Sequence, residues 1–308
     1  MNSKQKYKSE LILLLITLLW GATFVIVKES LKDISSMVFI SIRFFIAGVI
    51  LLPFVINKKI TKLNFKAGTL LGILLFIGFA VQTVGLKYTS ATKSGFFTGT
   101  TVIMIPILQT IIEKKRPTNG VIIGSILVMI GIAFLSSGGN SIFNLFNDVA
   151  TNFNLGDGLT LICAFFFAIY IIYLDLETAK HEFWILLFLQ IITTAVLGLA
   201  FSILFSGLNL EPFKINITKN LLGGILYTSI FATLITTALQ TKYQKGVTPA
   251  KAGIIFSFEP IFSAIFAFFI LEEKITNFGY LGAALIMLGL FVSELYENLI
   301  MKNGKSKV

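Results

Sequence analysis

Long runs of apolar residues, separated by short polar stretches, follow one another along the whole chain. A helix needs about 20 predominantly apolar residues to cross the hydrocarbon core of a bilayer. Ten runs reach this length, at 10–28, 35–56, 68–87, 91–112, 118–137, 156–175, 183–206, 220–241, 249–271 and 277–297. The pattern therefore predicts an all-α polytopic membrane protein with ten transmembrane helices joined by short loops.

The first apolar run follows three lysines and has the layout of a signal peptide at first sight. It continues to about Val27, however, whereas the apolar region of a signal peptide has about 7–15 residues. No small-residue cleavage site follows it. The run is therefore predicted to be an uncleaved first spanning helix.

The second half of the chain repeats the first half at an offset of 158 residues. The segment GSILVMIG, at 124–131, recurs as GAALIMLG at 282–289. Lys93 recurs as Lys251, and Gln82 recurs as Gln240. Because each repeat holds five helices, an odd number, the second copy must cross the membrane in the opposite sense. Inverted repeats of this kind are typical of secondary transporters.

The repeat divides the chain into two units and a connecting segment. The first five-helix repeat is predicted at 1–138 and the second, with a cytoplasmic tail, at 156–308. The segment between them, 139–155, has no Lys or Arg and carries Phe143, Leu145, Phe146 and Phe153. An apolar, uncharged connection of this kind is expected to lie along the membrane surface.

Composition and charge narrow the class of protein. Hydrophobic residues make up 56% of the chain and charged residues only 13%, whereas a soluble domain is about a quarter charged. The net charge of +10 arises from clusters between apolar runs, which indicates membrane topology and not nucleic-acid binding. With both termini in the cytoplasm, 17 of the 25 Lys and Arg residues lie on that side and seven lie on the other. The positive-inside rule thus predicts a cell-membrane protein with both termini cytoplasmic.

Five segments occur in an order that is specific to one family fold. They are LLWGATF at 18–24, IRFFIAGVILL at 42–52, YTSATKSGFFTG at 88–99, GDGLTLICAFFFAIYIIY at 156–173 and FEPIFSAIFAFFILEEKIT at 258–276. With these segments the chain resembles the EamA-type permeases of the drug/metabolite transporter superfamily. The resemblance implies ten helices in two inverted five-helix repeats around a central cavity, and transport of small metabolites by alternating access. It also implies a monomer, because the fused halves supply the symmetry that shorter relatives obtain by dimerising.

Two ionisable residues fall inside predicted spans, where a charge costs about 2.5–3.5 kcal/mol on insertion scales. Arg43 lies near the middle of 35–56, and Glu259 stands directly before Pro260 in 249–271. We expect Arg43 to hold a substrate carboxylate, and Glu259 to accept a proton or a substrate amine. The alternative is that each pairs with another buried group and only fixes helix packing. Arg43 has a third role open to it, the capping of carbonyls freed at a broken helix.

Four further residues are candidates for the transport pathway. Gln82 and Gln240 are repeat-related and come late in their helices, so they are expected near opposite mouths of the pathway. Their alternative role is hydrogen bonding between helices. Trp20 and Tyr170 are expected to form aromatic walls of the cavity, with ordinary core packing as the alternative.

Prolines and lysines mark candidate helix breaks or gates. Pro106 and Pro260 each remove a backbone hydrogen bond, and because they do not align in the repeat, they predict kinks at different depths. Lys93 and Lys251 begin repeat-related helices. The two lysines are expected either to anchor their helices at the membrane interface or to form gate contacts.

Four glycines predict close helix packing. Gly124 and Gly131 stand seven residues apart, as do their repeat copies Gly282 and Gly289. That spacing places each pair on one helix face, where small residues let helices approach closely. The fifth and tenth helices are therefore expected to contact each other or to occupy related peripheral positions.

Together these observations predict a secondary-active, alternating-access transporter of small organic metabolites, amino acids or similar compounds, that works as an exporter. Its expected partners are the lipid bilayer and a small-molecule substrate, with proton coupling or exchange and no nucleic acid. No cofactor or metal is predicted. The chain lacks H-E-x-x-H, G-x-S-x-G and Walker A motifs. An intramembrane enzyme and a non-transporting membrane scaffold remain the alternative classes.

Overall fold

A computed structural model describes residues 3–137, 143–144, 147, 151–271 and 276–305. Within this part of the chain the elements are helices, and the only β-type pairing is an isolated bridge between Ile34 and Ile215. Ten of the helical stretches are long and apolar enough to cross a membrane. The prediction of an all-α protein with ten spans is therefore confirmed.

The first half supplies five spans, of which the first and the fourth are each built from two α-helices. Their elements are α1 (Ser3–Gly21) with α2 (Thr23–Ser30), α3 (Ser36–Leu51) with the 3₁₀ turn η1 (Leu52–Phe54), α4 (Lys62–Tyr88), α5 (Ala91–Gly99) with α6 (Thr101–Glu113), and α7 (Asn119–Ser136).

The second half supplies the other five. Their elements are α9 (Leu155–Thr178), α10 (Phe183–Gly207), α11 (Lys219–Ser229) with the π-helix η2 (Ile230–Ile235), α12 (Thr236–Tyr243) and the 3₁₀ turn η3 (Gln244–Gly246), α13 (Pro249–Phe256) with α14 (Glu259–Leu271), and α15 (Asn277–Lys305). Much of the connection predicted at 139–155, including Leu145 and Phe146, lies outside the described residues, whereas Phe143 and Phe153 are exposed.

Short polar residues fix where these helices begin. Side-chain oxygens at seven N-cap positions accept hydrogen bonds from the first turn, at Thr61, Ser90, Thr118, Asn154, Glu182, Thr218 and Thr248. Such caps satisfy amide groups that have no partner within the helix. Ser90 and Thr248 stand 158 residues apart, as do Thr118 and the capping residue Thr276. The repeat is therefore preserved in the starting points of the helices.

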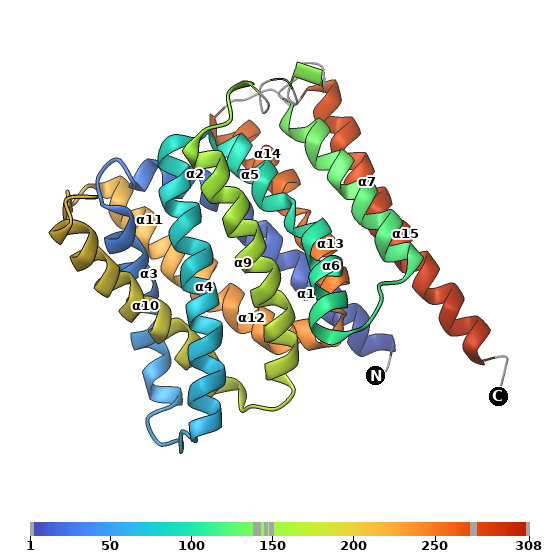
Figure 1. Cartoon of the computed structure of the whole chain (residues 1–308), viewed down its shortest axis with the longest axis horizontal. Helices are drawn as coiled ribbons and strands as arrows, with labels where there is room; N and C mark the ends of the chain where they lie inside the picture. The colour runs from blue at the N-terminus through green and yellow to red at the C-terminus, as the bar shows by residue number, and fades with distance from the viewer. Residues whose placement is uncertain (1–2, 138–142, 145–146, 148–150, 272–275, 306–308) are drawn as a thin grey trace.

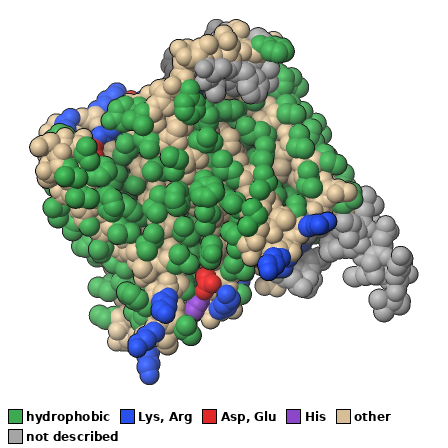
Figure 2. Space-filling view, in the orientation of Figure 1, with side chains coloured by type: hydrophobic (Ala, Val, Ile, Leu, Met, Phe, Trp, Pro, Cys, Tyr) green, Lys and Arg blue, Asp and Glu red, His purple; other side chains and the backbone are tan. Residues whose placement is uncertain are grey.

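The spans form one bundle, with α7 and α15 packed against each other at its flank (Figure 1). We call the end of the bundle at which α1 begins the proximal end and the other the distal end; α5 and α9 begin at the distal end (Figure 1). Hydrophobic side chains cover the visible flank, while Lys and Arg gather towards the ends (Figure 2). This distribution suits a bundle surrounded by lipid along its flank and by water at its ends.

The glycines at positions 124, 131, 282 and 289 lie in the contact between α7 and α15. A Cβ atom on Gly124 would lie 2.7 Å from the carbonyl oxygen of Gly289, and one on Gly131 would lie 2.7 Å from that of Gly282. These distances are too short for any side chain, so the two backbones touch directly. The fifth and tenth spans thus contact each other through the four glycines.

The fourth and ninth spans are each interrupted, at positions related by the repeat. Span four is broken at Thr100, and span nine is broken at Ser257 and Phe258. Thr100 and Phe258 stand 158 residues apart, the offset of the repeat. The interruptions therefore fall at the same depth in the two repeats, whereas kinks at the prolines themselves stay a prediction.

The break in span four does not lie at the proline. Pro106 is contained within α6, whereas the chain turns earlier, where the Thr100 hydroxyl donates to the Phe97 carbonyl at 2.6 Å. In span nine the Ser257 hydroxyl donates to the Gly253 carbonyl at 2.9 Å. Hydroxyl groups that bond back to the preceding turn bend helices, and they mark both breaks.

Candidate functional site

A cavity lies at the centre of the bundle, between the two halves of the chain. The volume open to the centre of a water molecule is about 100 Å³. Side chains from both halves line it, and these include Trp20, Arg43, Gln82, Tyr170, Gln240, Glu259 and Pro260. The six residues predicted for the pathway thus surround one space. Their transport role stays a prediction.

Arg43 extends from α3 to the π-helix in span eight. Its Nε donates to the Thr233 hydroxyl at 2.6 Å, and a terminal nitrogen donates to the Ala232 carbonyl at 3.0 Å. The guanidinium also lies 4.7 Å from the ring centroid of Phe79. A π-helix changes the backbone hydrogen-bond pattern and recurs at functional sites. Arg43 therefore caps a carbonyl of an irregular helix while it lines the cavity.

Glu259 is the first residue of α14, directly after the break in span nine. Its position at a helix N-terminus favours a negative charge there, because the helix dipole is positive at that end. Glu259 lines the same cavity as Arg43, and no salt bridge joins the two among the described residues. The cavity thus holds a basic and an acidic group that are not neutralised by each other.

Aromatic rings form much of the remaining wall. Trp20 contacts Phe256 edge to face at a centroid distance of 5.3 Å, and its indole nitrogen donates to the Thr236 hydroxyl at 3.2 Å. The hydroxyl of Tyr170 donates to Gln190 Oε1 at 2.9 Å. Each ring therefore has its polar atom fixed by a hydrogen bond and its apolar body available to the cavity wall.

The two repeat-related glutamines line the same cavity, and their placement near opposite mouths of the pathway stays a prediction. Gln82 donates to the Thr98 hydroxyl at 3.3 Å, and Gln240 donates to Gln244 Oε1 at 2.9 Å. Gln244 in turn donates to the Ile171 carbonyl at 2.6 Å. Both amides therefore line the cavity and also bond to neighbouring polar groups.

Sequence reasoning missed a set of hydroxyl groups around the cavity. The lining includes Thr23, Thr98, Thr101, Thr237 and Ser257. The signal was present in the eighth apolar run, where five threonines occur between positions 228 and 241. A run that must cross a bilayer has no need of so many hydroxyls, so their density could have identified span eight as a wall of the cavity.

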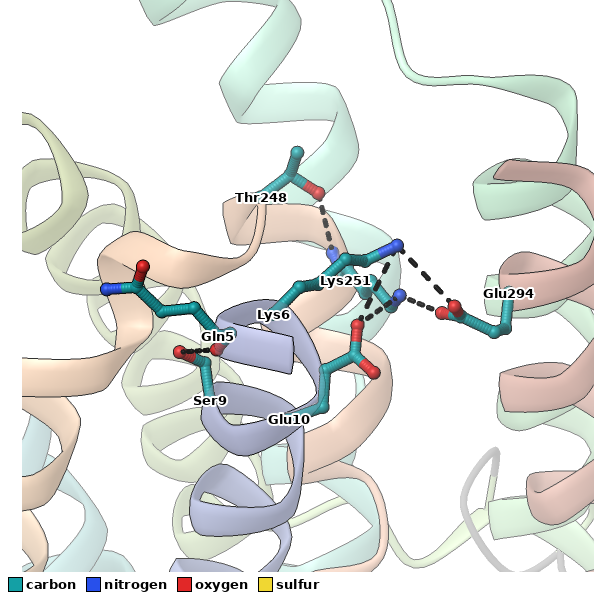
Figure 3. Close-up of polar contacts among 7 residues, drawn as sticks. All are labelled: Gln5, Lys6, Ser9, Glu10, Thr248, Lys251 and Glu294. Carbon is teal, nitrogen blue, oxygen red and sulfur yellow. Dashed lines mark hydrogen bonds and ion pairs between the residues drawn. The ribbon is translucent and has the colours of Figure 1, made fainter. Parts of the chain in front are cut away.

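The two lysines predicted as anchors or gates lie away from the cavity lining. Lys93 Nζ lies 3.9 Å from Asp157 Oδ2. Lys251 is buried and forms ion pairs with Glu10, at 2.6 Å, and with Glu294 (Figure 3). Of the two prolines, Pro260 lines the cavity, and Pro106 is buried outside its lining. The buried ion pairs of Lys251 favour a gate contact over an interface anchor for that residue, and both roles stay predictions.

Comparison with known proteins gives one family. A model of the EamA-like transporter family matches residues 8–137 and 154–295. A protein of Archaeoglobus fulgidus named "Uncharacterized transporter" is 34% identical over 291 residues, which cover 93% of this chain and 86% of that protein. "Uncharacterized transporter YoaV" of Bacillus subtilis is 23% identical over 283 residues, covering 90% and 94%.

A solved crystal structure supports the fold. It aligns with a TM-score of 0.74 over 94% of this chain and 98% of that one, at 16% sequence identity. At this identity the likeness shows the arrangement of helices and says nothing about the substrate.

Proposed function

The chain belongs to the EamA-like transporter family and is a multi-pass membrane transporter, and from this premise we propose that it carries small organic metabolites by secondary-active, alternating-access transport. The observation that carries the proposal is the placement of Arg43 and Glu259 on one central cavity. Charged groups at membrane depth are costly, and they are retained where a substrate or ion passes.

The size of the cavity supports a small substrate. The volume open to the centre of a water molecule, about 100 Å³, is well above the room that a single water needs, about 10–15 Å³. The space therefore holds several non-hydrogen atoms at once. This suits an amino acid or a metabolite of similar size.

The charges of the cavity support a substrate with an amine and an acidic group. The contacts to Thr233 and Ala232 use two of the five N–H donors of Arg43. We expect a substrate carboxylate to bind further donors of this guanidinium, and a substrate amine to bind Glu259. The aromatic rings of Trp20 and Tyr170 would then contact the apolar part of the substrate.

Glu259 also gives a physical route to coupling. A single carboxylate can bind a proton or a substrate ammonium group but not both at once, because either one neutralises its negative charge. If the two compete for Glu259, one proton enters as one substrate leaves, and a proton gradient drives export. We place both termini in the cytoplasm, from the distribution of Lys and Arg, and the protein as a monomer in the cell membrane.

Transport into liposomes tests the proposal. Purified protein is reconstituted, and counterflow of a panel of labelled amino acids and related amines is measured with and without a pH gradient. We expect counterflow of at least one compound, accelerated by the gradient in the direction of substrate export. Absence of counterflow for every compound would contradict the proposed substrate class.

A matched pair of variants tests the role of Glu259. We expect Glu259→Gln to lose the response to the pH gradient, because an amide neither binds a proton nor pairs with an ammonium group. Glu29→Gln is the control, since Glu29 lies on the surface, about half exposed, in an ion pair with Lys32. If Glu259→Gln and Glu29→Gln both respond like the unaltered protein, Glu259 has no part in coupling.

A further inference from the structure

We propose that two buried ion-pair clusters at opposite ends of the bundle act as alternate latches of the transport pathway. The proximal latch is Lys251 with Glu10 and Glu294, and the distal latch is Lys93 with Asp157. The inference rests on the alternating-access transport proposed above. It assigns the two lysines as positioning residues that determine which end of the pathway is closed.

The proximal latch joins three spans. Lys251, in the first turn of α13, pairs with Glu10 of α1 at 2.6 Å and with Glu294 of α15. Lys6 of α1 lies 3.5 Å from Glu294 and 3.9 Å from Glu10, so two ammonium groups face two carboxylates (Figure 3). The side chain of Lys251 is only 2% exposed. At this burial the pairs cannot be ordinary surface contacts.

The distal latch has the same construction. Lys93, in the first turn of α5, lies 3.9 Å from Asp157, whose side chain is fully buried. Asp157 also accepts a hydrogen bond from the Thr89 hydroxyl and belongs to the capping box that starts α9 with Asn154. The carboxylate is therefore fixed in place, and the lysine reaches towards it from another span.

The two latches are related by the inverted repeat. Lys93 and Lys251 are repeat copies, 158 residues apart, and each follows an N-cap at the start of a half-span. Each lysine pairs with a carboxylate near the start of the first span of the other repeat, namely Asp157 in α9 and Glu10 in α1. Both latches thus join one repeat to the other, at opposite ends. Both pairs are formed in this conformation, so a rocking motion that opens either end of the pathway has to separate one latch while the other stays closed.

The position of the lysines connects the latches to the cavity. A cation at a helix N-terminus opposes the helix dipole, so each lysine is stabilised there by its carboxylate partner. The short helices α5 and α13 that carry the lysines also carry Gly95 and Gly253, which line the cavity. Movement at a latch therefore moves the cavity wall, because each connecting helix is rigid over its short length.

The two latches differ in tightness. The side chain of Lys93 is 16% exposed, whereas the side chain of Lys251 is 2% exposed. From this difference in burial we expect the proximal end to be the more firmly closed of the two in this conformation. In this state we expect the cavity to be reached more readily from the distal side.

Thiol accessibility tests the latches without any substrate. Cys163, the single cysteine, is replaced by serine, and Thr237→Cys supplies a reporter on the cavity wall. Labelling by a membrane-impermeant reagent is measured from each side of the membrane. We expect Lys251→Gln to shift the ratio of proximal to distal labelling upwards by about tenfold, and Lys93→Gln to shift it downwards, within the usual range of coupling between sites.

Controls separate a latch from a merely structural contact. Lys251→Arg keeps the charge and should retain the ratio of the unaltered protein, and Lys32→Gln removes an exposed lysine and should leave the ratio unchanged. If Lys251→Gln does not fold, Glu294→Gln removes one carboxylate and should shift the ratio in the same direction. Shifts of both latch variants in one direction, or no shift in either, would overturn the proposal. A negative transport assay alone would count against the proposed function and not against the latches.

Discussion

The contact between α7 and α15 permits a sharp test at Gly282. An added Cβ at this position would lie 2.5 Å from the carbonyl oxygen of Gly131 and 2.6 Å from the backbone nitrogen of Leu135. Both neighbours are backbone atoms, so no side-chain rotation can relieve the clash. Gly282→Ala must therefore push the two helices apart or bend one of them.

The size of the effect follows from these distances. Restoring ordinary van der Waals contact requires a shift of about 1 Å, and a gap of about 0.5–1 Å removes a quarter to a half of the dispersion energy of the atoms involved. Overpacking of this kind costs about 1–3 kcal/mol. With about 2 °C per kcal/mol for a large chain, the melting temperature should fall by about 2–6 °C.

The assay is thermal unfolding of the purified protein in detergent, with Gly223→Ala as the matched control. Gly223 lies in α11, and an added Cβ there would meet nothing within 4 Å. Both substitutions gain about the same helix propensity, about 0.5–1 kcal/mol, so their difference isolates the clash. A melting temperature of Gly282→Ala equal to or above that of Gly223→Ala would refute the argument.

Three further substitutions or conditions have defined outcomes. Arg43→Met should lower stability by about 1–3 kcal/mol, because a buried carbonyl of the π-helix loses its donor, and an unchanged melting temperature would contradict the capping role. Tyr170→Phe should lower the free energy of unfolding by about 1 kcal/mol, because the hydrogen bond to Gln190 is lost. An unchanged melting temperature would show that this hydrogen bond contributes nothing to stability. Burial raises the pKa of Glu182, but hydrogen bonds from Lys58 and a backbone amide outweigh it and hold the pKa below 4.5. The stabilisation from ionised Glu182 is therefore present above pH 4.5 and lost as the pH falls through the lowered pKa. Glu182→Gln should be less stable than the unaltered protein at pH 7 but should lose less stability on acidification. Melting temperatures of the two proteins that fall in parallel with pH would exclude this linkage.

The spans and the cavity residues were predictable because the bilayer imposes simple rules. Span length, the cost of a charge at membrane depth and the disruption caused by Pro260 each mark residues without knowledge of their neighbours. These rules identified Arg43 and Glu259, which line one cavity. They also gave ten spans that the structure confirms.

The remaining features depend on contacts between distant residues. Lys251 stands at the start of a span, where a lysine usually faces the membrane surface, and its partner Glu10 is 241 residues away. The π-helix at Ile230–Ile235 exists beside an arginine from the other half of the chain. The break in span four falls at Thr100, because a hydroxyl there bonds back to the preceding turn, while Pro106 is accommodated within a helix. No local pattern specifies such pairings.

The glycine contact also has a bearing on the ancestry of the chain. Gly124 meets Gly289 while Gly131 meets Gly282. Because Gly289 is the repeat copy of Gly131 and Gly282 is the repeat copy of Gly124, each glycine of α7 meets the copy of the other α7 glycine. This is the self-complementary pattern of a two-fold interface, in which one surface patch binds a second copy of itself. A half-length ancestor carrying this one helix face could have assembled as an antiparallel homodimer before its gene was duplicated and fused. On this view the joining segment made an existing partnership permanent, and the two copies were then free to diverge.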